Sequence, residues 1–81
     1  MNIQITKIIK KLQETYKETY NRQYDIYFLM SELPEINDND IKNSLYYLKN
    51  KLMILGDEQS YLGEKIIKNF VITDFLINFQ N

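Results

Sequence analysis

The chain has 81 residues, of which 44% are hydrophobic and 26% charged, and its net charge is −1, with neither cysteine nor histidine. This length fits one domain over residues 1–81, and the composition is too apolar for an intrinsically disordered chain. The missing residue types exclude thiol and imidazole catalysis and the usual zinc sites, so we expect no metal and no other cofactor. The apolar stretches IYFLM and LMIL are too short to span a membrane, and the N-terminus lacks a signal-peptide pattern, so we expect a cytoplasmic protein.

The N-terminal segment has the pattern of an amphipathic helix. Ile5, Ile8, Ile9, Leu12 and Tyr16 follow the i, i+3, i+4, i+7 spacing, and lysine and glutamate fill most of the other positions. This spacing predicts a helix that begins near Ile5 and buries its isoleucines.

Four tyrosines continue the same stripe toward the middle of the chain. Tyr16, Tyr20, Tyr24 and Tyr27 are three or four residues apart, which favours packing in the core or in a dimer contact on one helix face. The alternative is a stacking surface for single-stranded nucleic acid. The polar stretch NRQYD offers N-caps at Asn21 or Asp25, so we predict a short join and a second helix over residues 24–33, ending before Pro34.

A third helix is predicted over residues 38–51. Asn37 or Asp38 can cap it, and Asp40 adds negative charge near its positive end. The predicted inward line is Ile41, Ser44, Leu45, Leu48 and Leu52.

The C-terminal third changes to a β-like pattern. LMIL and IIKNFVI are rich in β-branched, aliphatic or aromatic residues and are predicted to pair as an antiparallel hairpin, with DEQSYL as a polar turn between two glycines. Thr73 or Asp74 can cap a short last helix over FLINF. The predicted class is therefore α+β, with three helices, a two-stranded hairpin and a short C-terminal helix.

The stretch LMSELPEINDNDIKNSLYYLKNKLMI resembles the winged helix-turn-helix superfamily. The similarity lies in a leucine-rich second helix, a turn with one buried aliphatic residue at Ile36, and a third helix that continues directly into a strand. The later FVITDFLINF is similar to the strand and trailing helix of small members from phages and plasmids. The resemblance implies a DNA-binding transcriptional regulator whose third helix reads duplex DNA and whose hairpin forms a wing.

The outward face of the predicted third helix carries amides and lysines. Asparagine side chains can bond adenine, and lysine can bind phosphate or guanine. The alternative is an ordinary solvated helix face. Tyr46 and Tyr47 are adjacent and cannot both enter one core, so at least one should be exposed. The candidate nucleic-acid-binding residues are Asn39, Lys42, Asn43, Tyr46, Lys49 and Asn50.

Two kinds of partner remain open at this point besides the DNA. A homodimer is expected, because the domain carries many large apolar side chains and because regulators of this fold match two half-sites with two subunits. Asp57, Glu58 and Glu64 make the predicted wing acidic, which also suits an interaction module of a virus or mobile element that binds and inhibits a host protein. The expected dimer contacts are Ile5, Ile9, Tyr16 and Tyr20, or Phe75 and Phe79.

Enzymatic activity and calcium binding are not expected. The DND motif at residues 38–40 begins like a calcium loop, but Lys42, Asn43 and Lys49 stand where that loop needs an oxygen ligand, a glycine and a glutamate. So small a domain also leaves little room for a pocket deep enough to shift the pKa of a catalytic carboxyl group.

Overall fold

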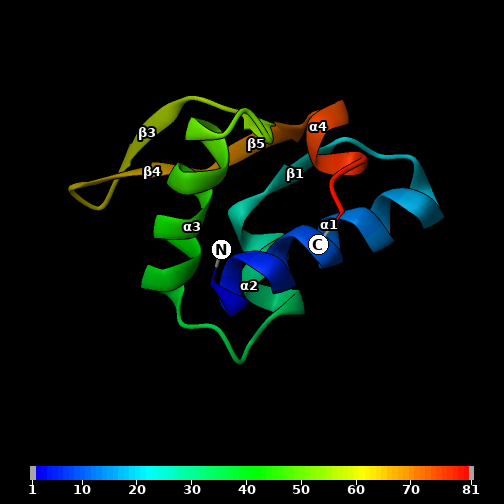
Figure 1. The fold of residues 1–81 in the computed structure, drawn as a ribbon. Helices are drawn as coiled ribbons and strands as arrows, with labels where there is room; N and C mark the ends of the chain where they lie inside the picture. The colour runs from blue at the N-terminus through cyan, green and yellow to red at the C-terminus, as the bar shows by residue number, and fades with distance from the viewer. Residues whose placement is uncertain (1, 81) are drawn as a thin grey trace.

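The structure is a computed structural model that describes residues 2–80, and it belongs to the α+β class, as predicted. Its principal extents are 35 × 24 × 23 Å, and it contains one three-stranded and one two-stranded antiparallel sheet (Figure 1). The elements in chain order are α1 (Ile3–Thr19), β1 (Gln23–Asp25), α2 (Ile26–Glu32), α3 (Asp38–Asn50), β2 (Ile54–Leu55), β3 (Glu58–Tyr61), β4 (Glu64–Ile67), β5 (Asn69–Ile72) and α4 (Asp74–Ile77).

Helix α1 forms where its apolar spacing predicts it. The Asn2 side chain caps it by accepting a hydrogen bond from the Ile5 amide at 2.8 Å, and Ile8, Ile9 and Leu12 are completely buried. The helix ends at Thr19 because the next residue turns into a left-handed conformation.

The predicted join between the first two helices is instead a strand. In β1, Tyr24 is buried and pairs with Phe70 of β5, so a residue expected on a helix lies in a sheet. Asp25 then caps α2 by accepting a hydrogen bond from the Phe28 amide at 2.9 Å. The second helix therefore begins at Ile26, two residues later than predicted, and the four tyrosines do not share one helix face.

Helix α3 begins as predicted. The Asn37 side chain accepts a hydrogen bond from the Asp40 amide at 2.8 Å, and the predicted inward residues Ile41, Ser44, Leu45 and Leu48 are buried. Leu29 of α2 and Ile36 of the preceding turn belong to the same core cluster.

Leu52, however, does not continue the buried line of α3. It is 67% exposed and left-handed, with a φ of 60°. The Leu52 amide donates to the Lys49 carbonyl, and the Met53 amide donates to the Leu48 carbonyl, which is the pair of bonds that closes a helix in the Schellman motif. Because this motif reverses the chain, α3 passes into a strand within a few residues and without a glycine.

The predicted antiparallel pairing of LMIL with IIKNFVI is confirmed, because β2 pairs with β5, but the predicted two-stranded hairpin and its polar turn are wrong. The segment DEQSYL contains β3, which pairs with β4, and only residues 62–63 form the turn. The predicted strand IIKNFVI divides at Lys68, whose carbonyl leaves the ladder to accept a hydrogen bond from the Ile26 amide at 2.8 Å. As a result β5 joins a second sheet, between β1 and β2.

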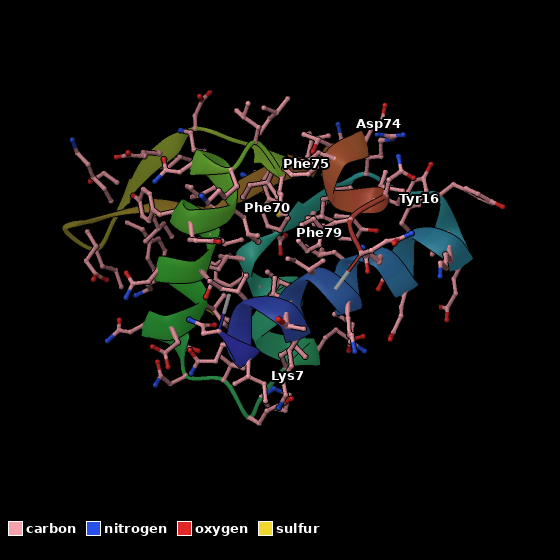
Figure 2. The ribbon with its side chains drawn as sticks, in the orientation of Figure 1. Lys7, Tyr16, Phe70, Asp74, Phe75 and Phe79 are labelled. Atoms are coloured by element: carbon pink, nitrogen blue, oxygen red, sulfur yellow. The ribbon has the colours of Figure 1, made fainter. Side chains whose placement is uncertain are left out.

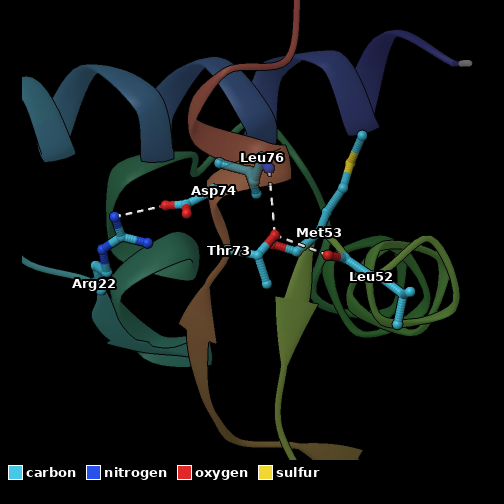
Figure 3. A network of polar contacts seen from close by, with 6 residues as sticks. All are labelled: Arg22, Leu52, Met53, Thr73, Asp74 and Leu76. Carbon is cyan, nitrogen blue, oxygen red and sulfur yellow. Dashed lines mark hydrogen bonds and ion pairs between the residues drawn. The ribbon is translucent and has the colours of Figure 1, made fainter.

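Helix α4 is held against the C-terminal parts of β5 and α1. Thr73 caps it, as predicted, and the Thr73 hydroxyl lies 2.8 Å from the Leu52 carbonyl oxygen (Figure 3). Gln13 of α1 donates to the carbonyl oxygens of Leu76 and Phe79, at 2.9 and 2.6 Å. None of the helices within residues 2–80 has the length and apolar character needed to cross a membrane.

Candidate nucleic-acid interface

The outward face of α3 carries a line of three exposed amide side chains. Asn39, Asn43 and Asn50 recur at the spacing of one helix face, opposite the buried Ile41 and Leu48. None of the three takes part in a side-chain hydrogen bond with another described residue. Their donors and acceptors are therefore available to a partner, and we call these residues the amide stripe.

Lys42, the first of the two flanking lysines, is already engaged. Its Nζ lies 2.9 Å from the Glu64 carboxylate of β4, and its side chain is only 21% exposed. The ion pair ties α3 to the hairpin formed by β3 and β4. Lys42 is thus brought to the candidate site, but its charge is largely compensated.

Lys49 lies about two turns further along the same side of α3. It is half-buried and forms no ion pair with any residue in the described part of the chain. Its positive charge is therefore uncompensated, unlike that of Lys42.

Tyr46 connects α3 with the hairpin a second time. Its hydroxyl donates a hydrogen bond to the Lys65 carbonyl oxygen at 3.0 Å. Burial of the ring, and secondarily the negative charge of Glu58, raise the pKa of Tyr46 above its ordinary value of 10.0. Tyr46 is half-buried, as is Tyr47, whose ring lies 5.6 Å from the Lys51 ammonium group.

The other strand of the hairpin, β3, brings Tyr61 near Tyr27 of α2. Interaction with the Tyr61 hydroxyl of β3 raises the pKa of Tyr27 in α2, followed by burial as the second cause. The Lys68 ammonium group also lies 5.8 Å from the centre of the Tyr27 ring. The Lys42 ion pair and the Tyr46 hydrogen bond thus hold the hairpin against α3, which fixes its position relative to the amide stripe.

These hairpin contacts were not found from the sequence. The alternation in EQSYLGEKI, with its Leu-Gly turn, could have indicated a hairpin of two strands. Lys42 and Glu64 are 22 residues apart, however, so their pairing depends on where the third helix directs the chain.

A separate hollow lies away from this face, over the β1 side of the three-stranded sheet. It is an open groove of about 740 Å³ whose lining includes Thr15, Gln23, Asp25, Leu55 and Asn69. Neither lysine nor arginine lines it. Within residues 2–80, no group of three or more Cys, His, Asp or Glu side chains is placed to hold a metal ion.

Comparison of the chain with protein-family models, with curated proteins and with solved structures found no match.

Proposed function

We propose that the chain is a winged helix-turn-helix domain that binds double-stranded DNA and acts as a transcriptional regulator. The observation that carries the proposal is the amide stripe: three exposed, unengaged asparagines on one face of α3, with Lys49 beside them. Helix-turn-helix proteins place such a face in the major groove. The element order supports the assignment, because α3 runs into a strand and a hairpin that packs alongside it.

The asparagines and lysines of this face would make different kinds of contact with DNA. Asparagine can donate to and accept from one adenine edge at once, so Asn39, Asn43 and Asn50 are the candidates for reading sequence. Lysine mainly neutralises phosphate, which suits the uncompensated Lys49. Lys42 contributes less, because Glu64 occupies its ammonium group.

The first test is a salt titration of binding to mixed duplex DNA with a matched pair of charge reversals. Lys49→Glu should abolish binding or lower its salt slope by at least about one, because one phosphate contact is lost. Lys17→Glu makes the same charge change near the C-terminal end of α1, far from α3 in Figure 1, and should have much less effect. Equal losses in both variants would show that α3 is not the binding face.

A second variant tests the role of the hairpin charge. Glu64→Gln releases Lys42 and removes a carboxylate beside the proposed phosphate path, so it should tighten DNA binding and steepen its salt dependence. Asn43→Ala should relax sequence preference, by about 1–3 kcal/mol of discrimination at one base, more than it weakens binding to mixed DNA.

The second candidate function is a protein-binding module. An example is a protein that a virus or mobile element encodes in order to inhibit a host protein. The observation that favours it is the compensation of Lys42 by Glu64, which removes positive charge from the face that should meet phosphate. This alternative predicts that neither the wild type nor the Glu64→Gln variant has salt-sensitive affinity for duplex DNA. Such a result would reject the proposed function while leaving the fold unaffected.

A further inference from the structure

The outer edge of strand β3 is open along its length. Its four residues are all exposed, and the strand runs along the margin of the molecule in Figure 1. β3 contains neither proline nor lysine, and its register with β4 has no bulge. Such features protect many natural strand edges from pairing with another chain. The fold therefore leaves β3 able to accept a further strand.

The hairpin register determines which backbone groups face that edge. The two turn residues, 62–63, have φ values of 50° and 82°, as a two-residue type I′ turn requires. Residues next to such a turn form a hydrogen-bonded pair, and bonded pairs alternate along the ladder. Tyr61 and Gln59 therefore direct their N–H and C=O groups to β4, whereas Glu58 and Ser60 direct theirs outward. None of these four outward groups hydrogen bonds with another described residue.

Two other strand edges are covered by side chains. The Asn21 side chain donates to the Gln23 carbonyl oxygen at 2.7 Å and accepts from the Gln23 amide at 3.2 Å, which occupies the outer edge of β1. On the outer edge of β4, the Tyr46 hydroxyl donates to the Lys65 carbonyl oxygen at 3.0 Å. The open edge is thus a particular feature of β3 and not a general property of these small sheets.

The charges beside the open edge favour a basic occupant. Asp57 and Glu58 are both exposed, and neither forms an ion pair with the described part of the chain. Lys65, the basic residue of the ladder, lies opposite Ser60 on β4, which is on the far side of β3 from the open edge. A strand that carries lysine or arginine would therefore meet uncompensated carboxylates.

We propose that the outer edge of β3 binds an extended, basic segment of a partner protein, which joins the hairpin as a third strand. The outward backbone groups of Glu58 and Ser60 would provide affinity, because each residue offers one donor and one acceptor at the spacing of a strand. Alternate side chains would provide specificity. Basic residues would lie beside Glu58 on one face and apolar residues beside Tyr61, which is 42% exposed, on the other.

A second copy of the chain fits this edge less well. Its β3 would bring two carboxylates toward the same two carboxylates, so like charges would meet. The homodimer contacts predicted from the sequence lie elsewhere. Ile5 and Ile9 are buried in the core of the monomer, so that part of the prediction is wrong. Phe75 is exposed beside Phe79, at the end of the molecule that holds α4 and away from the hairpin tip (Figure 2).

Peptide titration of the full chain, followed by NMR, tests the proposal without any DNA. The probe is the end-blocked peptide Lys-Val-Lys-Val-Lys, which alternates basic and apolar residues as a strand does. It should slow hydrogen exchange of the Glu58 and Ser60 amides. The Gln59 and Tyr61 amides should change much less, because they already face β4. The same peptide with every backbone amide methylated retains its charges but cannot donate to β3, so it should not bind.

Two substitutions at Ser60 form a matched pair. Ser60→Pro removes an N–H that points away from β4, so the hairpin can form while the edge loses a donor. Ser60→Ala retains that N–H. We expect Ser60→Pro to raise the dissociation constant of the lysine peptide at least about tenfold, and Ser60→Ala to leave it within about twofold. Unchanged far-UV circular dichroism would show that both variants fold, and the methylated peptide provides a test on the wild type alone.

A charge-reversed peptide tests the basic character of the occupant. Glu-Val-Glu-Val-Glu has the same backbone and the same valines, but its carboxylates would meet those of Asp57 and Glu58. It should bind at least about tenfold more weakly than the lysine peptide.

Four results would overturn the proposal. The first is no binding of the lysine peptide at concentrations up to about 1 mM. The second is equal affinity for the lysine peptide and for its methylated or charge-reversed form. The third is a loss of binding in Ser60→Ala as large as that in Ser60→Pro. The fourth is self-association of the wild type in sedimentation that Ser60→Pro abolishes, which would assign the edge to a second copy.

Discussion

The end of α3 provides the sharpest test of the packing, because two leucines on one predicted line have different environments. Leu48 is completely buried, whereas Leu52 is 67% exposed and left-handed. Truncation to alanine at the two positions should therefore have very different effects. At Leu52 a comparison of alanine with glycine should also reveal the strain of the backbone.

The expected magnitudes follow from burial and conformation. Leu48→Ala should lower the free energy of unfolding by about 2–5 kcal/mol, because it removes a fully enclosed side chain and leaves a cavity. Leu52→Ala loses about a third of the burial of a leucine, or about 0.5–1 kcal/mol. Leu52→Gly also relieves a left-handed strain of about 1–2 kcal/mol, against an unfolded-state cost of about 0.5–1 kcal/mol. Leu52→Gly should thus be more stable than Leu52→Ala by up to about 1.5 kcal/mol.

Urea and thermal unfolding, measured at about 1 µM so that self-association contributes least, provide the assay. Leu48→Ala should lower Tm by at least about 8 °C, and the two Leu52 variants should lie within a few degrees of the wild type. An alanine variant of Leu52 that is more stable than the glycine variant would refute the left-handed assignment. A Leu48→Ala cost below about 1 kcal/mol would refute the packing of α3.

Two further predictions concern the sheet region. Gly56→Ala should lower the free energy of unfolding in urea by about 1–3 kcal/mol, because a Cβ there would lie 2.7 Å from the Asn69 carbonyl oxygen. An unchanged free energy of unfolding would contradict this close approach. Tyr46 has a raised pKa in the folded state, so its contribution to stability is complete below pH 10.0 and is lost as pH rises through the folded pKa. Above pH 10.0 the free energy of unfolding of Tyr46→Phe should therefore fall less than that of the wild type. At neutral pH the variant should be less stable by about 0.5–1.5 kcal/mol, because it lacks the hydrogen bond to the Lys65 carbonyl oxygen. A pH profile parallel to that of the wild type would show that Tyr46 does not titrate as proposed.

The helices were predictable from the sequence because their signals are local. The isoleucine spacing of α1 and the Asn37 cap of α3 act within a few residues, and Pro34 limits α2 in the same way. Leu52 shows where a local pattern stops being sufficient. Its spacing from Leu48 continues the stripe, but the Schellman bonds end the helix at this point and leave the side chain in solvent.

The strands were harder to predict because their partners are distant in sequence. β1 contains three residues and is a strand because β5 lies beside it, about 45 residues later in the chain. The division of IIKNFVI at Lys68 likewise depends on the Ile26 amide, which no periodicity in that segment indicates. Polarity also misled the prediction of β3, since its four residues are all exposed and resemble a turn in composition.

In the candidate site, likewise, some features follow from residues close in sequence and others depend on residues far along the chain. Helical spacing alone puts Asn39, Asn43 and Asn50 on one face, and they are exposed together. The charge of that face could not be counted from the helix, because Glu64 arrives from the hairpin and compensates Lys42. The sequence therefore indicates which groups can read a partner, whereas the hairpin determines how much positive charge accompanies them. This is why Glu64→Gln separates the two proposed functions more sharply than any substitution within α3. The substitution removes a negative charge near the amide stripe and leaves its three asparagines unchanged.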